Sequence, residues 1–303
     1  MTKRILLFPG QGSQYLGMGK KLAESHAGAK RLLEEANDVL GFDLSDILWN
    51  GPEEKLTSTD NTQPALFTVS MMAMEWLKER NVAYDYAAGH SLGEYSALCA
   101  AGVFSFADGL KLVRLRGELM AKAGVAKPGA MSAILGLERD KLEEALKAAS
   151  ASGIVVAANF NSTTQIVISG EAAAVDAAEK LCAEAGAKKV VRLAVSGAFH
   201  SPLMEYAVEG FKPGLEGVAF SAPKVPVIQN VTAKPETDPA ALKAGLLKQL
   251  TAPVRWVESM QFAAEQGVTE ALEVGAGKVL MGLLRGITRD IKVTPVENPE
   301  DLA

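Results

Sequence analysis

The segment Gly89-His90-Ser91-Leu92-Gly93 constrains the fold more than any other part of the sequence. The apolar run Val82–Ala88 predicts a strand before it, and a helical pattern follows it through Cys99. A serine with glycines two positions away on each side, between a strand and a helix, is typical of a nucleophile elbow. Such a turn brings backbone segments so close together that a side chain at either glycine would clash. We therefore predict that Ser91 is an exposed nucleophile; a purely structural turn serine is the alternative.

Strands and helices alternate on both sides of this segment. Arg4–Phe8 predicts a strand that leads into a glycine-rich loop, residues 9–14, and Thr62–Glu79 has a helical pattern with Pro64 in its first turn. The alternation resumes near the C-terminus, in predicted strands 225–231 and 270–274 and predicted helices 240–250, 254–266 and from 278 onward. This order is typical of an α/β fold with a parallel sheet flanked by helices.

Residues 127–196 follow a different order. Strands are predicted at 130–135, 154–160, 165–169 and 189–195, with helices at 140–149 and 172–185. The order β-α-β-β-α-β is that of a ferredoxin-like unit. Because strand–helix alternation resumes after it, we expect a ferredoxin-like α+β subdomain at 127–196. It would be inserted into a discontinuous α/β catalytic domain formed by residues 1–126 and 197–303.

Composition and charge exclude several classes of protein. With 48% apolar residues in 303, the chain can bury a large core, and its formal charge of −5 argues against nucleic-acid binding. No apolar run approaches the roughly 18 residues that cross a bilayer, and the apolar core Ile5–Pro9 is too short for a signal peptide. Cys99 and Cys182 lie in helical patterns as core filler. We therefore expect a cytoplasmic protein that contacts neither membrane nor nucleic acid.

A serine nucleophile needs a base, and the chain has three histidines. His26 lies in a polar stretch and is expected at the surface. His90 adjoins Ser91, and neighbours at a strand end point to opposite faces, so it is poorly placed to act on Ser91. His200 follows the last strand of the predicted subdomain, where two domains meet and a cleft is common. We predict His200 as the base; a structural histidine is the alternative.

One arginine in the predicted helix 107–122 lies on its apolar face. Arg116 occupies this face, whereas Arg114 lies on the solvated face, paired with Glu118. A buried guanidinium is costly unless it is paired. Its partner is either an interior carboxylate or a carboxylate that arrives with the substrate, which an arginine fork grips by two parallel hydrogen bonds.

With these features placed, the sequence resembles the malonyl-CoA:acyl carrier protein transacylases along essentially the whole chain. The resemblance rests on the segments Phe8–Gln14, Asn61–Ala65, Gly89–Tyr95, Arg114–Gly117, Asn159–Ser162, Gly197–Ser201, Gln249–Leu250, Pro253–Trp256 and Glu273–Lys278. It implies an α/β hydrolase-like core with a ferredoxin-like insertion. It also implies that Ser91 is acylated, that His200 is the base, and that the main-chain carbonyl of Gln249 orients the His200 ring.

The same resemblance assigns the substrate-binding groups. Arg116 would bind the malonyl carboxylate, with Gln63 also in substrate binding, and the backbone amides of Gln11 and Leu92 would form the oxyanion hole. Phenylalanine before the catalytic histidine accompanies malonyl in related domains, where serine often accompanies methylmalonyl. Phe199 is therefore expected to favour malonyl.

The implied reaction moves a malonyl group from malonyl-CoA to the phosphopantetheine thiol of acyl carrier protein, by a ping-pong mechanism that serves fatty acid synthesis. No metal or redox cofactor is implied, and the family suggests a monomer. The alternatives are a stand-alone acyltransferase of a polyketide synthase, the malonyl-loading subunit of malonate decarboxylase, a serine thioester hydrolase, and a silent docking module for acyl carrier protein.

Overall fold

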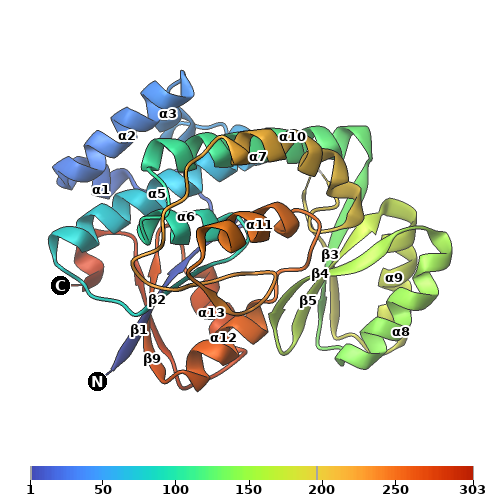
Figure 1. The fold of residues 1–303 in the computed structure, drawn as a ribbon. Coiled ribbons are helices and arrows are strands. Elements are labelled where there is room, and N and C mark those ends of the chain that lie inside the picture. Colours follow the sequence, from blue (N-terminus) through green and yellow to red (C-terminus); the bar gives the residue numbers. More distant parts are fainter. Residues whose placement is uncertain (1, 196, 303) are drawn as a thin grey trace.

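The computed structural model describes residues 2–195 and 197–302, which form a larger α/β unit and a smaller α+β unit side by side (Figure 1). The smaller unit contains β3 to β6 with helices α8 and α9, and the remaining elements belong to the larger one. Three positions that bound the predicted domains, 1, 196 and 303, lie outside the described residues. The domain boundaries therefore stay a prediction.

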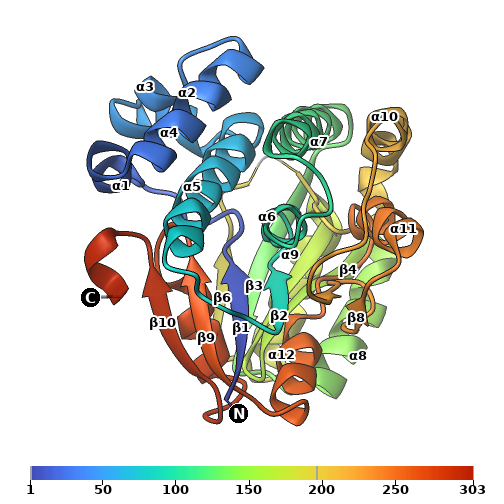
Figure 2. The ribbon, with the colours of Figure 1, turned by 60° about the vertical axis from the view of Figure 1, so that its left-hand side comes forward.

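A six-stranded sheet forms the centre of the larger unit (Figure 2). Its order is β10-β9-β1-β2-β7-β8, and all neighbours are parallel except β7 and β8. The strands are β1 (Lys3–Phe8), β2 (Tyr86–Gly89), β7 (Val227–Ile228), β8 (Pro235–Glu236), β9 (Val268–Val274) and β10 (Lys292–Val296). This confirms the predicted α/β class with a mainly parallel sheet.

Helices cover both faces of this sheet because both faces are apolar. In β1, Leu6 and Phe8 face one core, whereas Ile5 and Leu7 face the other with Trp256. The first core is covered by α5 (Thr59–Glu79), α6 (Gly93–Ala100) and α7 (Phe106–Ala126), and the second by α12 (Trp256–Glu265) and α13 (Val279–Arg285). Because successive side chains of a strand point to opposite faces, β1 contributes side chains to both cores.

Further helices surround this centre. Four of them precede α5: α1 (Lys20–Ser25), α2 (Ala27–Leu40), α3 (Leu44–Trp49) and α4 (Glu53–Thr57). Two more, α10 (Glu205–Glu216) and α11 (Pro239–Gln249), follow the smaller unit. Within residues 2–195 and 197–302, no helix has both the length and the apolar character that a membrane crossing requires.

The smaller unit has the predicted β-α-β-β-α-β order. Its elements are β3 (Gly129–Leu135), α8 (Arg139–Ala149), β4 (Val155–Ser162), β5 (Gln165–Glu171), α9 (Ala172–Glu184) and β6 (Lys189–Arg192). The sheet is antiparallel with the order β4-β5-β3-β6, and α8 and α9 share an apolar core with it. Met131 and Val167 instead join the large core. The backbone amide of Phe160 also bonds the carbonyl of Val254 at 2.9 Å, so β4 is tied to the larger unit.

The structure corrects several predicted boundaries. Helix α5 begins at Thr59 rather than 62, which places Pro64 inside the helix rather than in its first turn. The amide that proline lacks would have bonded the carbonyl of Asp60, and that carbonyl instead accepts from Nη1 of Arg114 at 2.8 Å. The strand predicted at 82–88 begins only at Tyr86. The strands predicted at 189–195 and 225–231 are also shorter, because each is paired over only a few residues.

The expectation that His26 is a surface residue is wrong. Its side chain is only 10% exposed and lies at the N-terminus of α2. Nδ1 accepts a hydrogen bond from the backbone amide of Ala29 at 3.0 Å, and Nε2 lies 2.8 Å from a carboxylate oxygen of Glu79. The ring thus satisfies one of the free amides of a helix start, a role more often filled by serine or aspartate.

Candidate active site

Ser91 occupies the sharp turn between β2 and α6, and its φ of 51° is in the left-handed region. The neighbouring glycines are required by close backbone contacts. A Cβ at Gly89 would lie 1.9 Å from the carbonyl group of Gly93, and a Cβ at Gly93 would lie 2.0 Å from the carbonyl oxygen of Phe8. The predicted steric reason for both glycines is therefore confirmed, and the turn presents the hydroxyl to a pocket.

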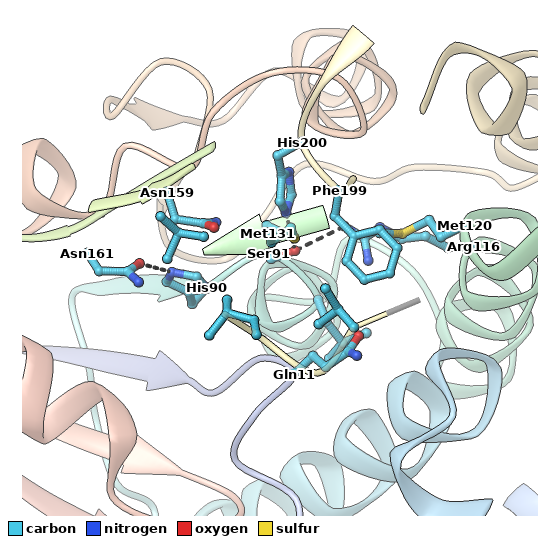
Figure 3. A pocket seen from close by; sticks show the side chains of 14 residues that line it. Gln11, His90, Ser91, Arg116, Met120, Met131, Asn159, Asn161, Phe199 and His200 are labelled. Carbon is cyan, nitrogen blue, oxygen red and sulfur yellow. Dashed lines mark hydrogen bonds between the residues drawn. The ribbon is translucent and has the colours of Figure 1, made fainter. Parts of the chain in front are cut away.

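The Ser91 hydroxyl is hydrogen-bonded to His200, as Figure 3 shows; its Oγ lies 2.8 Å from Nε2. The other ring nitrogen, Nδ1, donates to the main-chain oxygen of Gln249 at 2.8 Å, so Nε2 is the nitrogen free to accept. Burial, and then the charge of Arg116, lower the pKa of His200 to about 3. The ring is therefore neutral near pH 7 and able to take a proton from Ser91.

Arg116 is almost completely buried, with 1% of its surface exposed. Nη1 donates to Oε1 of Gln63 at 2.8 Å, while Nη2 donates to Oε1 of Gln249 at 3.0 Å and to Oγ of Ser91 at 3.1 Å. All of these partners are neutral, and in the part of the chain that the structure describes the guanidinium forms no ion pair. Burial lowers its pKa. The site therefore holds a positive charge without a carboxylate in direct contact with it.

His90 points away from the nucleophile. Its Nε2 lies 2.8 Å from the side-chain oxygen of Asn161, and its ring makes an edge contact with Trp256 at a centroid distance of 5.5 Å. Burial lowers the pKa of His90. The Nε2 of His90 is therefore bonded to Asn161, and the imidazole that bonds the Ser91 hydroxyl is that of His200, which agrees with the expectation from the strand-end position.

Two of the residues that line the pocket, Gln11 and Leu92, are those predicted to supply backbone amides to an oxyanion hole. No hydrogen bond is donated by either amide within residues 2–195 and 197–302. The Gln11 side chain is held elsewhere, with Nε2 donating to Oγ1 of Thr59 at 3.3 Å. Unpaired amides of residues that line the pocket of a serine hydroxyl are the kind of donors that stabilise an oxyanion.

The pocket lies where the two units meet. Side chains from the smaller unit form part of its wall: Met131 of β3, Asn159 and Asn161 of β4, Val167 of β5, and Leu193 and Val195 after β6. Met120 and Phe199 of the larger unit form another part (Figure 3). Gln63 and Gln249 contact Arg116 from outside this lining. Apart from these two glutamines, every site residue predicted from the sequence lines the pocket.

Two polar residues to which the sequence analysis assigned no role support the turn. Oε2 of the fully buried Glu94 accepts from the amide of Asn230 at 3.0 Å and from Nε2 of Gln249 at 2.7 Å. The Asn230 side chain in turn accepts from the amide of Ser91 at 2.7 Å and donates to the carbonyl of Gly89 at 2.7 Å. The sequence shows an acid three positions after the nucleophile, but no local pattern indicates that it is buried or which residues it contacts.

Comparison with known proteins agrees with this geometry. The family model described as acyl transferase domain matches residues 5–296. The malonyl CoA-acyl carrier protein transacylase of Bacillus subtilis is 46% identical over 303 residues, which is 100% of this chain and 96% of that protein.

Two solved structures extend the comparison to three dimensions. The acyl-carrier-protein-S-malonyltransferase of Bartonella henselae superposes with a TM-score of 0.96 at 44% identity, covering 99% of this chain and 97% of that one. A malonyl-transacylase in complex with its type II PKS acyl-carrier protein gives a TM-score of 0.96 at 42% identity, covering 99% and 98%. The chain therefore belongs to the acyl transferase domain family and, within it, to the malonyl CoA-acyl carrier protein transacylases.

Proposed function

We propose that the protein transfers a malonyl group from malonyl-CoA to the phosphopantetheine thiol of an acyl carrier protein and so supplies fatty acid synthesis. The observation that carries this proposal is the convergence of three groups. The hydroxyl of Ser91 lies 2.8 Å from the imidazole of His200 and 3.1 Å from the guanidinium of Arg116, in one pocket. Nucleophile, base and carboxylate receptor are the groups that transfer of a carboxylate-bearing acyl chain needs.

In the first half-reaction, Oγ of Ser91 attacks the thioester carbonyl while Nε2 of His200 takes its proton. The negative charge that develops on the carbonyl oxygen is stabilised by the amides of Gln11 and Leu92. Each such donor is worth about 3–4 kcal/mol in comparable sites. The carbon–sulfur bond then breaks, and the protonated His200 gives its proton to the leaving thiolate of CoA. Ser91 is left as a malonyl ester.

The second half-reaction runs the same steps in reverse order. The carrier-protein thiol enters the pocket, Nε2 of His200 takes its proton, and the thiolate attacks the ester carbonyl. Collapse of the tetrahedral intermediate breaks the bond to Oγ, and His200 returns the proton to Ser91. The main-chain carbonyl of Gln249 accepts from Nδ1 at 2.8 Å and keeps that nitrogen protonated throughout, so Nε2 is always the nitrogen that gains and loses the proton. The scheme uses no metal or redox cofactor.

Arg116 provides the preference for a terminal carboxylate. Gln63 and Gln249 hold the guanidinium by their side-chain oxygens without neutralising it. A malonyl carboxylate supplies the missing negative charge through two parallel hydrogen bonds. An acetyl group leaves the buried charge uncompensated, and this difference discriminates between the two thioesters.

Phe199 restricts what can be attached next to the thioester carbonyl. The residue is 5% exposed and lines the same pocket as the nucleophile. In the proposed binding mode it fills the space that a 2-methyl group would need, so malonyl is preferred over methylmalonyl. The smaller unit contributes pocket walls but neither nucleophile nor base.

We also propose the arrangement in which the protein works. The predicted inserted subdomain, 127–196, and the discontinuous domain, 1–126 and 197–303, act as one enzyme, and the pocket is complete within a single chain, which makes a monomer sufficient. Cys99 and Cys182 are free thiols, which suits the cytoplasm. The proposed chemistry is the same whichever carrier protein brings the thiol; the complex of a related malonyl-transacylase contains a type II PKS acyl-carrier protein.

Mass spectrometry of the intact protein tests the first half-reaction. Incubation with malonyl-CoA should add one malonyl group, located on Ser91 by peptide mapping, and Ser91→Ala should remain unmodified. Addition of holo acyl carrier protein should move the label to the carrier thiol. No adduct on Ser91 would refute the proposal. Rapid release of free malonate without an acceptor thiol would instead identify a thioester hydrolase.

A further inference from the structure

Glu94 is a buried acid that the proposed reaction does not use. It lies in the first turn of α6, three residues after Ser91, and none of its surface is exposed. Its hydrogen-bond partners, Asn230 and Gln249, are neutral. Burying a carboxylate is costly, so its presence at this position calls for a function that a neutral apolar residue could not fulfil.

The carboxylate determines which way the Gln249 amide faces. Oε2 of Glu94 accepts from the backbone amide of Asn230 at 3.0 Å, so this oxygen is an acceptor whether or not the other carboxyl oxygen carries a proton. The group 2.7 Å from Oε2 must therefore be Nε2 of Gln249. Oε1 is then turned toward Arg116 and accepts from Nη2 at 3.0 Å. A flipped amide would place two acceptors against each other on one side and two donors on the other.

Gln249 contacts all three groups of the proposed reaction. Its main-chain oxygen accepts from Nδ1 of His200 at 2.8 Å, its Oε1 accepts from Arg116, and its Nε2 also donates to the carbonyl of Ser91 at 3.1 Å. Asn230, the second partner of Glu94, bonds the backbone on both sides of the turn. The carboxyl group of Glu94 is therefore linked to the nucleophile, the base and the guanidinium, in each case through one intervening residue, either Gln249 or Asn230.

We propose that Glu94 is a positioning residue: it orients the side chain of Gln249, which holds Arg116 ready for a carboxylate, and it anchors Asn230 behind Ser91. This inference rests on the proposed function for the meaning of Arg116. The two hydrogen bonds that link Glu94 to Arg116 through Gln249 are formed within the protein itself, so this arrangement does not depend on a bound substrate.

Two substitutions of Glu94 distinguish the effect of its acceptor oxygen from the effect of filling the space with a side chain of similar length. Glu94→Gln is nearly isosteric and keeps an oxygen facing the amide of Asn230 and Nε2 of Gln249. Glu94→Met has a similar length but no acceptor there. The readout is the ratio of kcat/KM for malonyl-CoA to kcat/KM for acetyl-CoA. The contact between Arg116 and a carboxylate affects only the first of these.

The Gln variant should keep this ratio within about threefold of the wild type, whereas the Met variant should lower it about tenfold or more. A residue that only supports the fold would lower both rate constants together and leave the ratio unchanged. If the Met variant does not fold, Glu94→Asp replaces it. Its carboxylate is one methylene too short to reach Gln249, so it should also lower the ratio.

Crystal structures of the variants give a second readout that does not need activity. Oε1 of Gln249 should remain on Arg116 in the Gln variant and leave it in the Met or Asp variant. Folded Met and Asp variants with an unchanged ratio, or with Gln249 still on Arg116, would overturn the inference. If the wild type forms malonyl-Ser91 and transfers it, such a result leaves the proposed function intact. If the wild type does neither, the proposed function fails and the crystal structures still decide the role of Glu94.

Discussion

Ser91 and His200 are hydrogen-bonded at 2.8 Å, and both have a left-handed backbone, with φ of 51° and 57°. Only glycine adopts this conformation without strain.

Ser91→Ala and Ser91→Gly remove the same hydroxyl and differ only in a Cβ. We expect the Gly variant to be more stable by about 1 kcal/mol in urea denaturation. Both variants should form no malonyl adduct. An Ala variant as stable as the Gly variant would show that the turn stores no such strain.

The carboxylate preference should depend on the fork of Arg116. Replacement by Met leaves an apolar side chain of similar length, and we expect kcat/KM for malonyl-CoA to fall roughly 100-fold or more. Replacement by Lys keeps the charge but not the two parallel donors, so it should restore only part of this loss. Steady-state kinetics with acetyl-CoA supply the control, because acetyl transfer should fall much less. Equal losses for both thioesters would exclude Arg116 as the carboxylate receptor.

Stability should change with pH in a way that Glu94→Gln abolishes. Burial raises the pKa of Glu94 from 4.5 to about 7, against the hydrogen bonds from Asn230 and Gln249, which lower it. Between these pH values the folded state binds more protons than the unfolded state, so the free energy of unfolding falls as pH rises. The contribution is complete below pH 4.5 and is lost as pH rises through about 7.

Urea denaturation at pH 5 and pH 8 measures this effect. Relative to the wild type, the Glu94→Gln variant should gain roughly 2.5 kcal/mol between the two pH values, because the wild type loses about 1.36 kcal/mol for each pH unit between pH 5 and the folded-state pKa of about 7. Glu273, whose pKa burial also raises to about 7, is present in both proteins and cancels in the comparison. A difference between wild type and variant that does not change with pH would contradict the assignment.

The turn should not tolerate a methyl group at Gly89. A Cβ there would lie 1.9 Å from the carbonyl group of Gly93, which is backbone and cannot move aside. We expect Gly89→Ala to destabilise the protein by about 3 kcal/mol or more, or to prevent folding. Gly282→Ala is the matched control, since this glycine lies in helix α13 with open space around it. It should stabilise by about 0.5–1 kcal/mol in thermal or urea denaturation.

Substitution of Phe199 by Ser should widen the acyl pocket. We expect kcat/KM for methylmalonyl-CoA to rise relative to malonyl-CoA by about tenfold, because a buried ring beside the nucleophile is removed. The lost packing should cost about 3 kcal/mol of stability, so assays belong well below the melting temperature. Phe199→Tyr, which keeps the ring, should leave the preference unchanged. Unaltered discrimination in the Ser variant would place the specificity elsewhere.

The parts of the fold that could be predicted from the sequence are those with a local physical signature. The glycines around Ser91 are required by contacts within a single turn, and the order of strands and helices in residues 129–192 follows from local hydrophobic patterns. The face occupied by Arg116 follows in the same way from helical spacing. Each of these signals depends on neighbours in the sequence, which is why each could be interpreted without the structure.

The parts that could not be predicted depend on distant contacts. Glu94 meets Asn230 across 136 positions and Gln249 across 155, and no local pattern indicates that an acid three residues after the nucleophile is buried. The polar neighbours of His26 in the sequence predict exposure, yet its side chain is 10% exposed because it caps the start of α2 and lies against the distant Glu79. The same reason applies to β10, an edge strand that is defined only by its pairing with β9.

The two units contribute different parts of the pocket. Met131, Val167 and Leu193 of the smaller unit shape the space available to an acyl chain, while the larger unit holds the reacting groups. The wall contributed by the smaller unit is therefore encoded in a separate stretch of sequence from the reacting groups, whereas Arg116 and Phe199, which select the acyl group, lie in the same unit as Ser91 and His200. Substitutions in the smaller unit can therefore reshape one wall of the pocket while the nucleophile, the base and the carboxylate receptor stay unaltered.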